Sequence, residues 1–362
     1  MIKALHEDSS TTEVTMRLLI VTACLMVLLI PAESHGDKYA GEFMALGGGA
    51  RAMGMGGAFT ALADDATASF WNPAGIARVP SMLGLPHDWE MTLMHSERFG
   101  DLIDYNFVSA VFPLSHGESG WGLTFIHMGI DDIPITPGFS EMVSNSDGDD
   151  IFEPREGEGL INYRDFPLES ANDFALFLSY AQHVGIGAVG ATVKLLRNDQ
   201  ITDVSSFGIG LDLGLIMHDL WRRLSLGVKL QDATGTYISW STGKKEFIYP
   251  TLKVGVAYPL MLNRMNSTLV LAVDGDFRYE NLQSVSQLWI GRASLDVHLG
   301  AELIIREIVA LRGGLDMGRP TAGAGFVLHK FGPWDMTLGL DYALLIHDVL
   351  DTTHRVSLLL AH

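Results

Sequence analysis

The sequence predicts an all-β protein, a transmembrane antiparallel β-barrel of about 14 strands with an N-terminal plug in its lumen. Three observations support this prediction. The chain has 362 residues, 48% of them hydrophobic, yet no stretch after residue 31 approaches the roughly 20 apolar residues of a membrane helix. A long series of short segments alternates between apolar and small or polar residues, and one glycine-rich stretch precedes that series.

The leader is predicted over residues 1–34 as a signal peptide, with a possible start at Met16. Met16-Arg17 is followed by a run of 13 mostly apolar residues, which is typical of a secretory signal. Small residues around Ala32 and Ser34 suit cleavage near Ser34. An alternative is a lipoprotein box that ends at Cys24. Cys24 is the only cysteine, so a mature chain without the leader forms no disulfide.

The plug is predicted over residues 35–80. Its central part, from Gly47 to Ala77, is rich in small residues, which suit a segment confined in a lumen and closely approached by other backbone. Asp64 and Asp65 precede a segment that we expect to form a short helix, whose free N–H groups a carboxylate can cap. The candidate plug and gate residues are Arg51, Asp64, Asp65, Asn72, Pro73 and Ala74.

The barrel is predicted over residues 81–362. Between Ser206 and Leu215, and again between Leu295 and Leu303, apolar residues alternate with small or polar ones. Successive side chains of a strand point to opposite faces. A soluble sandwich would turn the apolar face inward, whereas a membrane barrel turns it out to lipid.

The predicted strands centre near residues 88, 108, 125, 178, 191, 211, 228, 254, 272, 299, 312, 325, 340 and 358. Pro86 interrupts the first of them. Connections after the third, fifth, seventh, ninth and thirteenth strands look long, and those after the fourth, sixth, tenth and twelfth look short, an alternation typical of outer-membrane barrels. Aromatic residues expected in the interface girdles are Tyr105, Trp121, Tyr180, Trp221, Tyr258, Trp289, Trp334 and Tyr342.

The longest connection runs from Gly129 to Asp173 and holds twelve acidic residues. By strand parity it should face outside. Clustered oxygen ligands suit calcium, so two interpretations stay open, a solvated loop and a calcium site at Asn145, Asp147, Asp149 and Asp150. The net charge of -19 argues against a nucleic-acid partner, because phosphate binding needs clustered Lys and Arg.

Enzyme motifs are weak, and apart from that open calcium interpretation we expect no enzyme, no cofactor and no metal site. The string GGGARA at 47–52 fits a dinucleotide pattern but lacks the strand before it and the βαβ unit around it. Met55 stands where a phosphate-binding loop needs lysine. The sequence holds neither H-E-x-x-H nor G-x-S-x-G.

Charged residues fall on the predicted lumen face with both signs present. They are Lys194, Asp212, Lys229, Lys253, Asp274, Asp296, Glu302, Arg312, Asp316 and Asp341. One interpretation is structural ion pairing, among themselves or with Arg51, Asp64 and Asp65 of the plug. The other is a polar path with a gate.

Two regions resemble a known family. The N-terminal region has LGGGARAMGMGGAF at 46–59 and WNPAGI at 71–76, and the C-terminal region has VALRGG at 309–314, TAGAGF at 321–326, LDYA at 340–343 and THRVSL at 353–358. These strings resemble PorV/PorQ-type outer-membrane proteins, which belong to the group similar to the FadL long-chain fatty-acid channel. The resemblance implies a fourteen-stranded barrel with an N-terminal hatch that ends at Asn72-Pro73-Ala74.

The resemblance leaves three functions open. FadL-like members pass hydrophobic small molecules, and PorV-like members hold secreted protein cargo at the outer membrane for type IX secretion. A structural barrel without transport is the third. In each case the expected setting is the outer membrane of a Gram-negative-type cell, with lipid around a single, monomeric barrel.

Overall fold

The computed structural model describes residues 41–78, 88–98, 102–114, 118–135, 167–185, 187–221, 223–280, 282, 285–332, 335–346 and 352–362. The predicted signal peptide, Pro86, Trp334 and the four candidate calcium ligands lie outside these residues. Within them, no helix has both the length and the apolar character needed to span a membrane.

All strands belong to one antiparallel sheet. The strands are β1 (Glu90–Arg98), β2 (Ile103–Leu114), β3 (Ser119–Pro134), β4 (Leu168–Val184), β5 (Gly187–Gln200), β6 (Val204–Met217), β7 (Ser225–Gln231), β8 (Thr236–Trp240), β9 (Lys245–Ile248), β10 (Thr251–Leu262), β11 (Ser267–Tyr279), β12 (Leu288–Ile290), β13 (Ala293–Ile305), β14 (Val309–Asp316), β15 (Arg319–Phe331), β16 (Met336–Leu345) and β17 (Thr353–Ala361). A short 3-10 turn, η5 (Asn263–Met265), joins β10 to β11.

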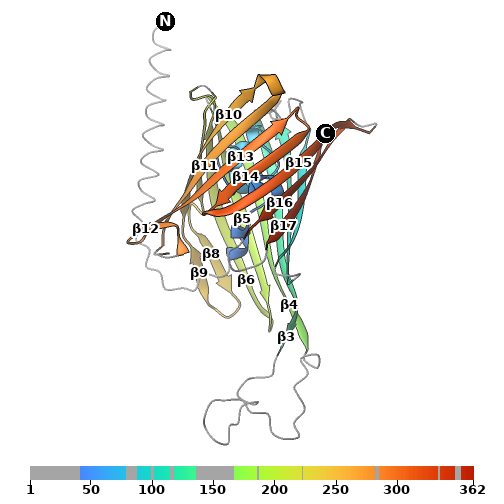
Figure 1. The fold of residues 1–362 in the computed structure, drawn as a ribbon. Helices are drawn as coiled ribbons and strands as arrows, with labels where there is room; N and C mark the ends of the chain where they lie inside the picture. Colours follow the sequence, from blue (N-terminus) through green and yellow to red (C-terminus); the bar gives the residue numbers. More distant parts are fainter. Residues whose placement is uncertain are drawn as a thin grey trace, which may run out of the picture.

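The sheet closes on itself because β1 pairs with both β2 and β17 (Figure 1). β6 pairs with β7 and then β8, and these two short strands together form one strand of the wall. β9, which pairs with β8, and β10, which pairs with β7, likewise form one strand of the wall together. β12 pairs only with the first residues of β13. The wall therefore has 14 strands, which confirms the predicted fold class.

Most strands lie where alternation predicts them, with three corrections. β1 begins at Glu90, so the predicted centre at 88 is wrong. The connection between β5 and β6 is only residues 201–203, because both strands extend to meet each other, and so the long connection expected there is wrong. The seventh connection, also predicted to be long, is largely the paired hairpin β8–β9.

The outer surface of the wall is apolar. In β6, Phe207, Ile209 and Leu213 are exposed, whereas Asp212 between the last two is buried. The same alternation runs around the wall, which gives an apolar band suited to lipid. Tyr105 corrects the predicted aromatic girdles, because it is fully buried and points into the lumen.

Residues 41–78 lie inside the barrel (Figure 1). They form η1 (Glu42–Leu46), α2 (Ala50–Gly54), α3 (Ala68–Trp71) and η2 (Pro73–Arg78). We call the end of the wall where β1 begins and β17 ends the terminal end, and the opposite end, where β3 gives way to β4, the loop end. η1 packs near the loop end against Tyr105 and Phe107, and η2 packs near the terminal end against β3 to β6.

Candidate functional site

Arg51 is the centre of an ion-pair network between the plug and the wall. Its guanidinium meets Asp64 at 2.7 Å and Asp65 at 3.1 Å within the plug. Toward the wall it donates to both carboxylate oxygens of Glu302, at 2.9 and 2.8 Å. Arg312 donates to Glu302 at 2.7 Å and to Asp341 at 2.6 Å. Bidentate bonds between charged groups combine strength with a fixed geometry, so this network holds α2 in one position.

Asp65 also accepts a hydrogen bond outside the ion-pair network. Its Oδ1 accepts a hydrogen bond at 2.9 Å from the backbone N–H of Thr67, the residue before α3. α3 itself begins after Thr67 without a side-chain cap bond, so the predicted capping of the helix by a carboxylate is wrong, and Asp65 closes a turn just before the helix instead. Burial raises the pKa of the Asp65 carboxyl, and the positive charge of Arg51 opposes that rise.

Wall side chains bond the plug backbone directly. Asp274 accepts the N–H groups of Phe59 and Thr60 at 2.9 and 2.7 Å. Glu90 accepts the N–H of Ala66 at 2.7 Å. Ser357 accepts the N–H of Ala50 at 2.8 Å, also in a buried setting. Because a buried N–H without a partner is costly, these wall residues compensate for the irregular backbone of the plug. Of these three wall residues, only Asp274 is among the lumen residues predicted from the sequence.

Glycines of the wall let the plug backbone approach closely. A Cβ at Gly300 would lie 2.6 Å from the carbonyl oxygen of Met55, and one at Gly323 would lie 3.2 Å from Gly54 Cα. The same crowding by the plug occurs at Gly122, Gly190, Gly214, Gly227, Gly255 and Gly314. We call these eight residues the glycine belt. At six of the eight positions a larger residue would collide first with the plug, and at Gly255 and Gly323 it would first meet the wall residues Asp274 and Tyr342.

The Asn72-Pro73-Ala74 turn docks against part of this belt. Asn72 Nδ2 donates to the Thr60 carbonyl at 2.9 Å, and Asn72 Oδ1 accepts from the N–H of Ala74 at 3.2 Å. Asn72 and Pro73 stand beside Gly214, and Pro73 also lies against Gly190. Asn72 is fully buried. The turn therefore ties two parts of the plug together where the chain nears the terminal end.

A second charge cluster occupies the wall between β5 and β10. Lys194 pairs with Asp212 at 2.7 Å and with Asp232 at 2.5 Å. Lys229 pairs with Asp212 at 3.0 Å and donates to the Phe70 carbonyl at 2.6 Å. All four charged side chains are buried. Asp232 was absent from the predicted lumen residues because it lies in the turn between β7 and β8, outside the alternating pattern.

A third cluster centres on His298 of β13. Its ring lies 3.0 Å from Asp316 and 3.7 Å from Asp276, and Nδ1 is 3.1 Å from the carbonyl oxygen of Gly56 in the plug. Arg278 bridges Asp276 and Asp296 at 3.5 and 2.6 Å. Lys253 also pairs with Asp276. The structure thus brings the remaining predicted lumen charges together in one cluster that contacts the plug.

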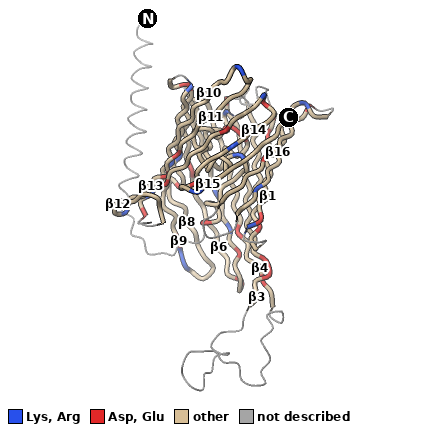
Figure 2. The backbone as a smooth tube through the Cα atoms, in the orientation of Figure 1, with Lys and Arg blue, Asp and Glu red and all other residues tan. Residues whose placement is uncertain are grey.

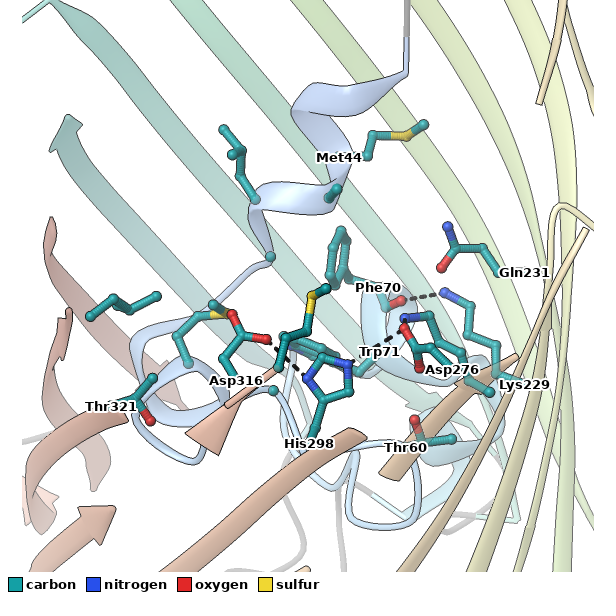
Figure 3. Close-up of a pocket in the computed structure, with 18 of the residues that line it drawn as sticks. Met44, Thr60, Phe70, Trp71, Lys229, Gln231, Asp276, His298, Asp316 and Thr321 are labelled. Carbon is teal, nitrogen blue, oxygen red and sulfur yellow. Dashed lines mark hydrogen bonds and ion pairs between the residues drawn. The ribbon is translucent and has the colours of Figure 1, made fainter. Parts of the chain in front are cut away.

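A cavity of about 290 Å³ lies between the plug and these clusters. Figure 3 shows Met44 of η1 on one side, Phe70 and Trp71 of the plug in the middle, and His298 with Asp316 on the wall side. Its apolar lining consists of Met44, Ala45, Leu46, Met53, Phe70, Trp71, Phe177, Met317, Leu345 and Ile346. The rest of the lining is mostly polar or charged.

Aromatic rings form one wall of this cavity. Phe70 stacks on Phe177 with centroids 6.1 Å apart and meets Trp71 and Phe107 edge-on at 5.2 and 5.8 Å. Such ring pairs are rigid and favour other flat apolar groups. Trp71 also donates to the Gly48 carbonyl at 2.7 Å. In the sequence Trp71 stands out only as part of the motif WNPAGI, and no pattern marks Phe70.

Arg355 of β17 also belongs to the site, although it is not among the residues predicted from the sequence. It is fully buried, lines the cavity and donates to the carbonyl oxygens of Leu46 and Gly47 at 2.6 and 3.3 Å. It therefore holds the end of η1. The signal was present in the sequence, because Thr353, Arg355 and Ser357 alternate with His354, Val356 and Leu358.

Solved structures of other proteins are similar to this chain in fold. The toluene transporter TodX of P. putida superposes with a TM-score of 0.51 and 13% identity, over 87% of this chain and 97% of that one. A Pseudomonas aeruginosa FadL homologue superposes with a TM-score of 0.47 and 11% identity, over 91% and 98%. No family model and no curated protein sequence matches the chain. The chain therefore shares the barrel fold of TodX.

Proposed function

We propose that this protein is a plugged outer-membrane channel for the passive passage of hydrophobic small molecules. The observation that carries the proposal is the cavity of about 290 Å³ between the plug and the wall, with its cluster of aromatic rings. Small-molecule sites are concave and mainly apolar, with volumes from about 300 Å³ upward. The cavity is near the lower limit of that range. Most of its lining residues are polar or charged, and its aromatic side is the part that would accept a small, flat, apolar solute.

The plug supplies the gate in this proposal. Residues 41–78 close the lumen on the terminal-end side of the cavity. The residues that hold them there are Arg51, Asp64, Asp65, Asn72, Pro73 and Ala74. The charged lumen residues act mainly as structural ion pairs, because most of them already bind a partner of opposite sign. No step of this function makes or breaks a covalent bond, so the proposed protein is a channel and not an enzyme.

The orientation belongs to the same proposal. The loop end, with the β3–β4 connection, faces outside, and the terminal end faces the periplasm. The cavity lies toward the outside, since η1 and the β14–β15 turn beside it are near the loop end. A solute would then meet the cavity before it meets the plug. The barrel acts as a monomer that an N-terminal signal peptide directs to export.

Uptake by intact cells tests the channel. Cells that lack the protein are given the wild type, Leu46→Lys or Leu102→Lys, and uptake of radiolabelled toluene is measured. Leu46 lines the cavity, so a charge there should lower uptake several-fold, whereas Leu102 is exposed at the loop end and serves as the matched control. Equal uptake with and without the wild-type protein would instead support a structural barrel.

A second candidate function is a PorV-like accessory of type IX secretion, in keeping with the PorV/PorQ resemblance. The observation in its favour is the length of β3 and β4, 16 and 17 residues, which extend beyond the neighbouring strands (Figure 1). Such a projection offers a surface for secreted protein cargo. Removal of the gene should then leave cargo in the periplasm and should leave toluene uptake unchanged.

A further inference from the structure

The charges that line the cavity are mostly positive. Seven of the lining residues are Lys or Arg and three are Asp, although the whole chain carries a net charge of -19. The projecting part of β3 and β4 at the loop end is acidic, and Figure 2 shows red segments beside β4. The excess of positive charge is therefore a property of the cavity and not of the whole loop end.

One side of the cavity has balanced charge. Between β5 and β13 the lining cations pair with Asp212 or with Asp276, as Lys229 does with Asp212 at 3.0 Å. Figure 3 shows Lys229 and Asp276 on this side, and Thr321 of β15 on the opposite side. Because each of these cations has a carboxylate beside it, this side needs no further anion.

The other side, from β15 through β17 to β1, is rich in arginine. Its lining includes Arg98 of β1, Arg319 and Thr321 of β15, and Thr353 and Arg355 of β17. Among the described residues of these strands, no carboxylate lines the cavity. β1 and β17 are paired neighbours, so Arg98 and Arg355 lie on adjacent strands. We call Arg98, Arg319 and Arg355 the arginine group.

The carboxylate that precedes this side along the chain has another partner. Asp316, at the end of β14, lies 3.0 Å from the ring of His298. Arg98 and Arg319 are half-buried, so part of each side chain is accessible. The arginine group therefore combines two accessible cations with Arg355, which is fully buried.

Arg355 is a buried cation without a counter-charge. It donates to the carbonyl oxygens of Leu46 and Gly47 and lies over the Tyr105 ring, 5.8 Å from its centroid. Among the residues that the structure describes, none forms an ion pair with Arg355, and neither its Nε–H nor the Tyr105 hydroxyl has a hydrogen-bond partner. An uncompensated buried charge is costly. An anion in this part of the cavity would reduce that cost.

The arginine group borders the aromatic rings of the cavity. Tyr105, which lies under Arg355, and Phe107 are both buried on the lumen face of β2. Phe107 in turn meets Phe70 edge-on at 5.8 Å. A solute with its ring against Phe70 can therefore direct a negatively charged substituent toward the arginine group.

We propose that the solute is an aromatic carboxylate, with its ring against Phe70 and Phe177 and its carboxylate toward the arginine group. The inference rests on the proposed channel function and names the chemical class of its solute. Arginine binds a carboxylate through two parallel N–H groups. A cavity of about 290 Å³ suits a single ring with one small substituent.

Binding of two matched ligands to the purified full-length barrel tests this inference. Radiolabelled benzoate or its neutral analogue benzamide is offered by equilibrium dialysis to the protein in a neutral detergent, with detergent alone as the blank. The wild type should bind benzoate about tenfold more tightly than benzamide, which corresponds to about 1.4 kcal/mol. R355Q and R98Q/R319Q should each lose most of this preference and should bind benzamide like the wild type.

R98Q/R319Q leaves the bonds of Arg355 to the plug in place, so it remains informative if R355Q displaces the plug. The matched control removes two cations at the terminal end. Arg306 and Lys330 are exposed there, so R306Q/K330Q should keep the wild-type preference. All variants should keep the gel shift between boiled and unboiled samples that reports a closed barrel.

Three results would overturn the inference. They are equal wild-type affinity for benzoate and benzamide, an unchanged preference in R98Q/R319Q, and an equal loss of preference in R306Q/K330Q. Uptake of toluene by intact cells tests the channel itself. Toluene uptake that depends on the protein, together with equal affinity for the two ligands, would keep the channel and reject the anionic solute.

Discussion

Arg51 of the plug and Glu302 of the wall meet through two parallel hydrogen bonds, Nε to Oε1 at 2.9 Å and Nη2 to Oε2 at 2.8 Å. The two residues are separated by 251 positions in the chain. Both side chains are largely buried, and Arg312 binds the same carboxylate. This pair is a bidentate ion pair that joins the plug to the wall.

The substitution Arg51→Met should loosen the plug. It leaves the buried carboxylates of Asp64 and Asp65 without their cation and Glu302 with Arg312 alone, a loss on the order of 3–5 kcal/mol. Single-channel recordings should show frequent openings that the wild type lacks. Arg197→Gln removes an exposed ion pair with Asp199 and should change nothing. Recordings of Arg51→Met that match the wild type would argue against the network as the lock.

Enlarging a glycine of the belt should displace the plug by overlap. A side chain at Gly190 would collide with Pro73 backbone atoms, so Gly190→Val should raise the basal conductance, at a cost of about 1–3 kcal/mol from overpacking. Gly313 faces open space, and Gly313→Val is the matched control on the lipid side. The same conductance in both variants would contradict close docking at Gly190.

Changing Asn72 and Pro73 together to Ala should give a partly open pore. Asn72 loses its bonds to Thr60 and Ala74, each worth about 1–3 kcal/mol in a buried setting, and Pro73 no longer restricts the turn. We expect short, flickering openings rather than a steady current, because the Arg51 network remains. A steady, fully open pore would place the main lock at this turn instead.

Orientation can be tested with protease on intact cells. The connection between β3 and β4 should be cut from outside, because the loop end faces outward in our account. The β6–β7 connection, at the terminal end, should be cut only after lysis. The reverse pattern would invert the barrel and would move the cavity to the periplasmic side.

Alternation made the wall predictable because strand side chains have a strict period of two. Within β6 and β13 that period is unbroken, and both strands lie where it places them. The alternation no longer predicts the strands where the chain bends. β7 and β8 are separated by a turn that contains Asp232, and β12 lies outside the closed wall. Such interruptions depend on tertiary pairing that no local pattern records.

The site was only partly predictable. Opposite charges on Arg51 and on the lumen face suggest pairing, but sequence alone does not select Glu302 among several carboxylates. The glycine belt is dispersed over distant strands, and its members share only their contact with the plug. Arg355 could have been found by parity in β17. Phe70 could not, because its position beside Phe177 depends on how the plug folds back.

The central claim is that residues 41–78 close the barrel, and single-channel conductance of a chain lacking residues 40–70 tests it most directly. A lumen of about fourteen strands is wider than its own side chains can fill. The deletion variant should still form a barrel, seen as a gel shift on boiling, and should conduct with a larger and steadier current than the intact chain. A folded deletion variant with unchanged conductance would contradict the account.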